Sequence, residues 1–166
     1  TRIPNLSGFN GTLRLMNSGT TGDKFNVAAN LIMPGSLIIE SGNQIFIPGS
    51  TTATFTSGIN VTGTGNNENR GALRLGGTLA GPVTLAGNTT VGSEGGSITG
   101  TITSGAAGTQ TLTIGTSNST GNVTLSNAIG GGTGTIAITK TQVGQLNLSG
   151  NNTYTGLTTI SGGAVA

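Results

Sequence analysis

The chain contains no cysteine, no histidine and no tryptophan among its 166 residues. These absences exclude disulfide and thiol chemistry, the usual zinc sites and histidine-based catalysis. Only four carboxylates are present, at Asp23, Glu40, Glu68 and Glu94, and neighbours in this set lie at least 17 residues apart. Glycoside hydrolysis needs two carboxylates that face each other, whereas we expect these four to be solvated loop charges. We therefore predict that the protein is not an enzyme and binds no metal or other cofactor.

Charge and aromatic side chains are also scarce. Charged residues make up 6% of the chain, where about a quarter is typical, and the net charge is only +2. Nucleic-acid binding normally needs a clustered basic patch with stacking aromatics, but aromatics are 3% and the basic residues are scattered. Apolar runs such as Leu37–Ile39 are far shorter than the ~20 residues of a membrane span. We expect neither a nucleic-acid partner nor a membrane span in this segment.

Glycine and alternating apolar residues are abundant instead. The 32 glycines show no strict third-residue period, which excludes a collagen helix. Pairs of apolar residues two positions apart recur along the chain, with glycine, asparagine or proline beside them. Examples are Leu13 with Leu15, Leu37 with Ile39, Leu73 with Leu75, and Leu146 with Leu148. Alternation at period two places each pair on one face of a strand, and helical spacing is absent, so the fold class is all-β.

Two all-β architectures fit this pattern. A β-sandwich also has strands every eight to twelve residues, but it usually has aromatic anchors and hairpin turns. Similar units recur instead at offsets of sixty and forty residues, as in 11–15 and 71–75, or 81–86 and 121–126. Those offsets suit coils of about twenty residues with insertions. We favour a β-solenoid of about seven coils over the sandwich, which stays open as the alternative.

The C-terminal stretch contains one complete coil in its sequence pattern. Leu146 and Leu148 share one face of a strand, and Thr158 and Ile160 share one face of another. Glycine and asparagine at 150 and 151 tolerate a left-handed backbone and predict the corner between these strands. We expect Leu146, Leu148, Ile160 and Val165 to be buried, with Leu73 and Leu75 in a similar column.

This stretch resembles the autotransporter-associated β-strand repeat of bacterial secreted passenger domains. The matching positions are Leu146, Leu148, Gly150, Asn152, Thr153, Tyr154, Thr155, Gly156, Thr158, Thr159, Ile160 and Gly163. The resemblance covers the last two dozen residues and implies a right-handed parallel β-helix, exported and displayed at the cell surface. Within the motif, the single tyrosine, Tyr154, is expected to pack at a corner against the neighbouring coil.

We expect one solenoid domain over residues 1–166, more irregular in 1–70 and more regular in 71–166. The chain opens without a signal peptide and ends within a repeat, so we expect a segment of a longer protein. A parallel solenoid exposes unpaired backbone groups on its terminal coils. We therefore predict that the C-terminal coil is covered, by further repeats or by another copy stacked head to tail.

The function expected from these features is structural: a segment of a secreted or surface-displayed bacterial fibre or passenger. The alternative is an adhesin that binds host or matrix glycans along the side of the solenoid. Arg14 and Arg74 each lie between two inward leucines, so both face outward, and Arg70 is close in sequence. These three arginines are weak candidates for binding an acidic glycan.

Overall fold

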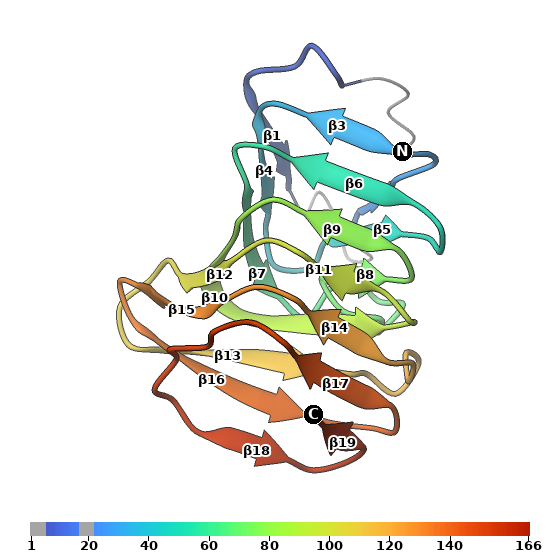
Figure 1. The fold of residues 1–166 in the computed structure, drawn as a ribbon. Coiled ribbons are helices and arrows are strands. Elements are labelled where there is room, and N and C mark those ends of the chain that lie inside the picture. The colour runs from blue at the N-terminus through green and yellow to red at the C-terminus, as the bar shows by residue number, and fades with distance from the viewer. Residues whose placement is uncertain (1–5, 17–21) are drawn as a thin grey trace.

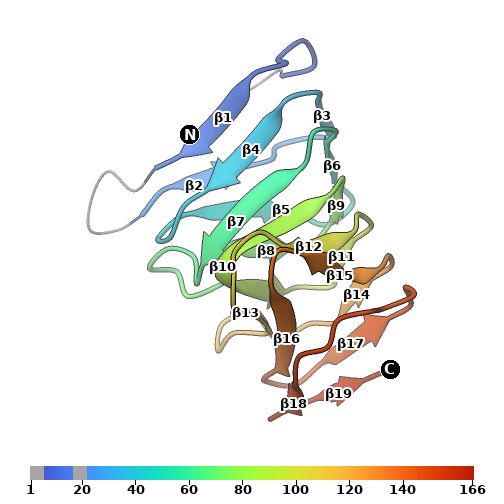
Figure 2. The same ribbon diagram turned by 90° about the vertical axis from the view of Figure 1, so that its left-hand side faces the viewer.

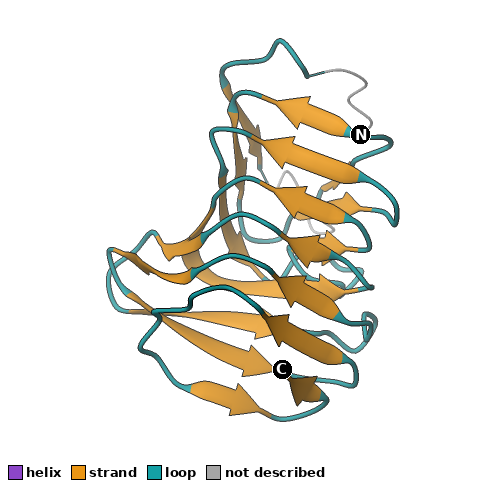
Figure 3. Ribbon diagram, viewed as in Figure 1, coloured by secondary structure: helices purple, strands orange, loops and turns teal. Residues whose placement is uncertain are grey.

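The protein is a parallel β-solenoid of about six turns in a computed structural model that describes residues 6–16 and 22–166 (Figure 1). The described residues form strands joined by turns and loops, and no helix occurs among them (Figure 3). Every strand pair in these ranges is parallel. The predicted solenoid is therefore confirmed, and the β-sandwich alternative is wrong.

Each coil of the solenoid has three sides. The first side consists of β1 (Thr12–Leu15), β4 (Ser36–Ile39), β7 (Ile59–Gly63), the start of β10 (Val83–Ser93), β12 (Ile102–Ser104) and β15 (Ile129–Gly132). The second side consists of β2 (Lys24–Asn26), β5 (Gln44–Ile47), β8 (Leu73–Leu75), the end of β10, β13 (Thr109–Ile114), β16 (Thr135–Lys140) and β18 (Thr158–Ile160). The third side consists of β3 (Leu31–Met33), β6 (Thr52–Phe55), β9 (Thr78–Ala80), β11 (Ser97–Ile98), β14 (Val123–Leu125), β17 (Gln145–Leu148) and β19 (Ala164–Val165). Figure 2 shows β1, β4 and β7 stacked one after another along the rod.

Strand β10 joins the first two sides because it continues around the corner between them. Its residues 83–85 pair with 59–61 of β7, and its residues 91–93 pair with 73–75 of β8. This bend merges both sides into one 12-stranded sheet, while the third side is a separate 7-stranded sheet. Six coils each contribute a strand to the first side, and β18 with β19 begins a seventh coil. The structure therefore contains six complete coils, where about seven were predicted.

The core consists of inward columns that run along the rod. On the second side, Phe25, Ile45, Leu73, Val91 and Ile114 follow one another in register, and all are buried. Strand alternation points each of these side chains inward, and parallel pairing without slippage stacks them. Leu73 and Leu75 are both fully buried, as predicted.

The coils differ in length more than the sequence offsets suggested. Ile45 pairs with Leu73, 28 residues later, whereas Leu73 pairs with Val91, 18 residues later. The similar units at 11–15 and 71–75, and a unit of the same Gly-x-Leu-x-Leu form at 144–148, lie on three different sides of the solenoid. Their offsets therefore do not mark one column. Each unit is a short strand with two inward leucines, and all three sides require that pattern.

Burial in the C-terminal coils depends on whether a further strand residue pairs beyond each side chain, as Val165 does beyond Leu146. Leu146 is fully buried, but Leu148 and Val165 are only partly buried. The prediction that Ile160 is buried is wrong, because its exposed fraction is 55%. Ile160 does stand on the inward face, in register with buried Lys140. No further strand of the described chain pairs with β18, so the inward side chain is left open.

The corners of the repeat motif use glycine for two different reasons. Gly163 has a φ of 72°, a left-handed backbone that suits glycine. Gly150 and Gly156 are not among the residues with positive φ, so the left-handed corner predicted at 150 is wrong. A Cβ at Gly150 would lie 2.2 Å from the carbonyl of Asn127 in the coil before. This glycine allows two coils to approach closely.

Candidate functional site

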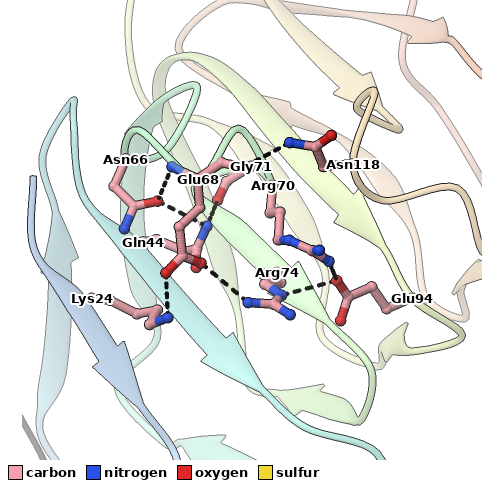
Figure 4. A network of polar contacts seen from close by, with 9 residues as sticks. All are labelled: Lys24, Gln44, Asn66, Glu68, Arg70, Gly71, Arg74, Glu94 and Asn118. Carbon is pink, nitrogen blue, oxygen red and sulfur yellow. Dashed lines mark hydrogen bonds and ion pairs between the residues drawn. The ribbon is translucent and has the colours of Figure 1, made fainter. Parts of the chain in front are cut away.

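A cluster of ion pairs lies on the outer face of the second side (Figure 4). We define this ion-pair cluster as Lys24, Glu68, Arg70, Arg74 and Glu94. The Arg74 guanidinium donates from Nη1 to Glu68 Oε2 at 3.1 Å and from Nε to Glu94 Oε1 at 2.9 Å. Lys24 also pairs with Glu68, and Arg70 pairs with Glu94 at 2.5 Å. Cation and anion therefore alternate across four segments of the chain.

The loop at residues 64–71 holds this cluster against the sheet. Gln44 on β5 is fully buried beneath it, and its Nε2 donates to Gly71 O at 3.0 Å and Asn66 Oδ1 at 3.3 Å. The loop also meets the turn at 116–119, where Asn118 Nδ2 donates to Glu68 O at 3.0 Å. The loop that lengthens one coil is therefore tied to neighbouring coils and to the strand face below it.

Electrostatics and stacking both favour the charged state of this cluster. The hydrogen bond from Lys24 lowers the pKa of Glu68 below its ordinary value of 4.5, with nearby Arg74 and Arg70 acting in the same direction and burial opposing them. Arg74 also lies over the Phe46 ring, 4.0 Å from its centroid, in cation–π geometry. The cluster is thus a structural network in which each charge has an opposite partner.

The candidate ligand residues of the sequence analysis belong to such pairs. Arg14 faces outward, as predicted, and its guanidinium pairs with Glu40. Arg70 and Arg74 both pair with Glu94. Glu40, Glu68 and Glu94 are thus partners of basic side chains, so the expectation that they are merely solvated loop charges is wrong. Coil stacking joins residues that the sequence separates by 20 or more positions.

A buried lysine stands in the core near the C-terminal end. Lys140 continues the inward column after Ile114, and its exposed fraction is 0%. Its Nζ donates to the carbonyls of Thr141 at 2.5 Å and Gln142 at 2.8 Å in the adjoining corner. Burial lowers the pKa of Lys140 from its ordinary value of 10.5. The buried ammonium therefore has backbone acceptors in this corner, as buried polar groups normally do.

Asparagine side chains tie consecutive coils together at several corners. Asn30 Oδ1 accepts from Thr52 N at 2.8 Å, and Asn122 Oδ1 accepts from Gln145 N at 2.7 Å. Each accepting asparagine lies 22 or 23 residues before the donor, one coil earlier. In the reverse direction, Asn152 Oδ1 accepts from Ile129 N at 3.0 Å. Asn152 belongs to the repeat motif seen in the sequence, whereas the roles of Asn30 and Asn122 were not predicted.

The remaining motif residues are structural by position. Tyr154 is partly buried against the core, its N donates to Ile129 O at 3.0 Å, and its hydroxyl lies 2.9 Å from Thr158 Oγ1. Leu146 follows Val123 in register on the third side. Within residues 6–16 and 22–166, no three acidic or other metal-ligating side chains gather into a possible metal site. The same ranges contain no helix of the length and apolar character needed to cross a membrane.

Comparison with protein families supports the C-terminal pattern. Residues 138–166 match the passenger-associated transport repeat. This confirms the resemblance to the autotransporter-associated β-strand repeat. The match spans the end of β16, β17, β18 and β19, so the passenger-associated transport repeat includes Lys140, Tyr154 and the open inward position of Ile160. Comparisons with curated proteins and with solved structures gave no match.

Residues could be identified from the sequence alone where they lie close together along the chain, as in the passenger-associated transport repeat. The motif residues are adjacent in sequence, so the pattern is visible directly. Lys140 had a usable signal, since it follows Ile136 and Ile138 at period two in one strand. The ion-pair cluster had no such signal, because Lys24 and Glu94 belong to other coils than Glu68, Arg70 and Arg74.

Proposed function

We propose that this protein is a non-catalytic structural segment of a secreted or surface-displayed passenger, built to continue by stacking coil on coil. The observation that carries the proposal is the position of the passenger-associated transport repeat at the open edge of the solenoid. The inward residue Ile160 is 55% exposed there, and β18 and β19 each pair with a single strand. An edge with free backbone groups and apolar inward positions favours addition of another coil.

The added coil comes from a longer parent chain or from a second copy stacked head to tail. Low charge supports such a contact, because little repulsion opposes it. A head-to-tail contact between copies does not close on itself, so it extends as a filament. The same edge therefore serves a fibre as well as a long passenger.

Analytical ultracentrifugation with negative-stain electron microscopy tests this proposal. We expect the purified chain to associate as its concentration rises and to form end-to-end rods. Ile160→Lys places a charge on the open edge and should suppress association without loss of the fold. Thr113→Lys is the matched control, because β13 is paired on both sides and Thr113 lies beside inward-facing Leu112 and Ile114, so its side chain points outward. A monomer at every concentration, with amides of β18 and β19 protected from exchange, would refute the proposal.

A second candidate function is an adhesin that binds glycans along the side of the solenoid. Its original candidates, Arg14, Arg70 and Arg74, are all paired with glutamates, which weakens them as sites for an acidic glycan. The observation that favours an adhesin is a different one: a neutral hollow over β4, β7 and β10.

A further inference from the structure

The outer face of the first side contains a hollow of about 220 Å³ that the functions above do not use. We call it the first-side hollow. Its lining includes Ser36, Ile38, Ser57, Asn60, Pro82 and Thr84. Ligand pockets for drug-sized molecules are ~300–1,000 Å³, so this one suits a single small unit of a larger ligand.

The chemistry of the lining is polar but uncharged. Ile38, Asn60 and Thr84 form one outward row, because β4, β7 and β10 pair in that register. Neighbouring residues of this row are ~4.8 Å apart, the spacing of paired strands. The side chains of Asn60 and Thr84 make no hydrogen bond to any described residue. An amide and a hydroxyl therefore stand side by side with donors and acceptors available.

Apolar surface borders these polar groups. Ile38 borders the hollow at one side, where Arg14 follows it in register with its guanidinium paired to Glu40, and the exposed ring of Pro82 lies beside Thr84. The hydroxyl of Ser57 donates to Pro34 O at 2.7 Å and keeps its lone pairs for a ligand. Hydroxyl and amide groups set between aliphatic patches match a pyranose ring, which has C–H faces and a rim of hydroxyls.

Other ligand classes fit less well. A peptide cannot add as a strand, because β4, β7 and this part of β10 are each paired on both sides. A phosphate or an acidic glycan needs a cation, and no charged side chain lines the first-side hollow among the described residues. A lipid chain needs a deeper and more apolar cavity than this polar surface hollow.

We propose that the first-side hollow binds one residue of a neutral oligosaccharide, with Asn60 and Thr84 contacting its hydroxyls and with Ile38 and Pro82 against its C–H faces. This inference rests on the second candidate function and gives that function a site and a ligand class. The site is neutral, and none of the three arginines first considered contributes to it.

The experiment is a titration of the whole ¹⁵N-labelled chain, followed by amide chemical shifts. The probes are cellotetraose, mannotetraose, chitotetraose and β-1,4-galactotetraose, with a heparin tetrasaccharide as the acidic comparison. We expect at least one neutral probe to give saturable shifts confined to residues 36–38, 57–60 and 82–84. Asn60→Ala should weaken that binding up to about tenfold, the value of one lost hydrogen bond. Thr113→Ala, on the second side, should leave it unchanged.

Several results would overturn the inference. These are the absence of saturable shifts with all four neutral probes, shifts that map to another face, unchanged affinity in Asn60→Ala, or tighter binding of heparin in the hollow. The sedimentation test of coil stacking does not involve this face. A failure of sugar binding therefore leaves the structural proposal intact. If the coils fail to stack, the sugar site is still tested independently by the amide chemical shifts.

Discussion

Removing the side chain of Leu146 should destabilise the C-terminal coils strongly. Leu146 is fully buried on the third side, in register between Val123 and Val165. Truncation of a buried leucine to alanine costs ~2–5 kcal/mol, through lost transfer energy and the cavity left behind. The same truncation at partly buried Leu148 should cost about half as much, ~1–2 kcal/mol. Ile160→Ala should cost less than ~1 kcal/mol, because the side chain is already 55% exposed.

Native-state hydrogen exchange is the appropriate assay, because coils of a solenoid open partly independently of one another. The amides of β17 should exchange at least about 25-fold faster in Leu146→Ala, the equivalent of ~2 kcal/mol. Urea denaturation followed by circular dichroism gives the global change for the same three variants. A cost for Leu146→Ala no greater than that for Ile160→Ala would refute the inward columns as the source of stability at this end.

Three further outcomes are expected. Because the pKa of Glu68 is lowered by folding, its contribution to stability is present above its ordinary pKa of 4.5 and lost as pH falls through the folded value. Urea midpoints measured down to acidic pH should therefore fall less steeply in Glu68→Gln than in the wild type. Burial lowers the pKa of Lys140, so the unfolded chain holds this proton more tightly, and stability should rise as pH increases from the folded pKa towards 10.5. Thermal scans should show that this rise is absent in Lys140→Met; an equal rise in the variant would contradict the assignment. Asn122→Ala should cost ~0.5–1.5 kcal/mol and speed exchange of the Gln145 amide, whereas Asn122→Asp should retain the acceptor and most of the protection.

The fold class was predictable because every coil repeats one simple rule. Period-two apolar pairs with glycine beside them specify short half-buried strands, as the fully buried pair at Leu73 and Leu75 shows. The number and length of the coils were harder to predict from the sequence. Insertions such as the loop at 64–71 change the spacing without changing the strand pattern.

The functional surface was predictable only where its residues are local in sequence. The repeat motif was found because its members lie within two dozen residues. Arg74 was correctly placed on the outside, but its partners were not predicted. Stacking of coils brings Glu94 to it, and the path of the loop at 64–71 brings Glu68. Ile160 was correctly predicted to face inward but wrongly predicted to be buried. A strand pattern shows which way a side chain points, but it does not show whether another coil covers it.

The direction of the backbone hydrogen bonds has a mechanical consequence. In this solenoid the bonds between strands run along the rod axis, so tension along the rod acts on all bonds at one boundary between coils together. The boundaries between coils are arranged in series, so each of them carries the same force. The load at rupture is therefore set by the weakest boundary and does not grow with the number of coils. In the described chain, the last boundary has paired strands on the second and third sides, at β18 and β19, but on the first side only the bonds of residues 152–154 to Ile129. This boundary should therefore separate first under load. A rod of this kind can become longer without becoming weaker, provided that its added coils pair on all three sides.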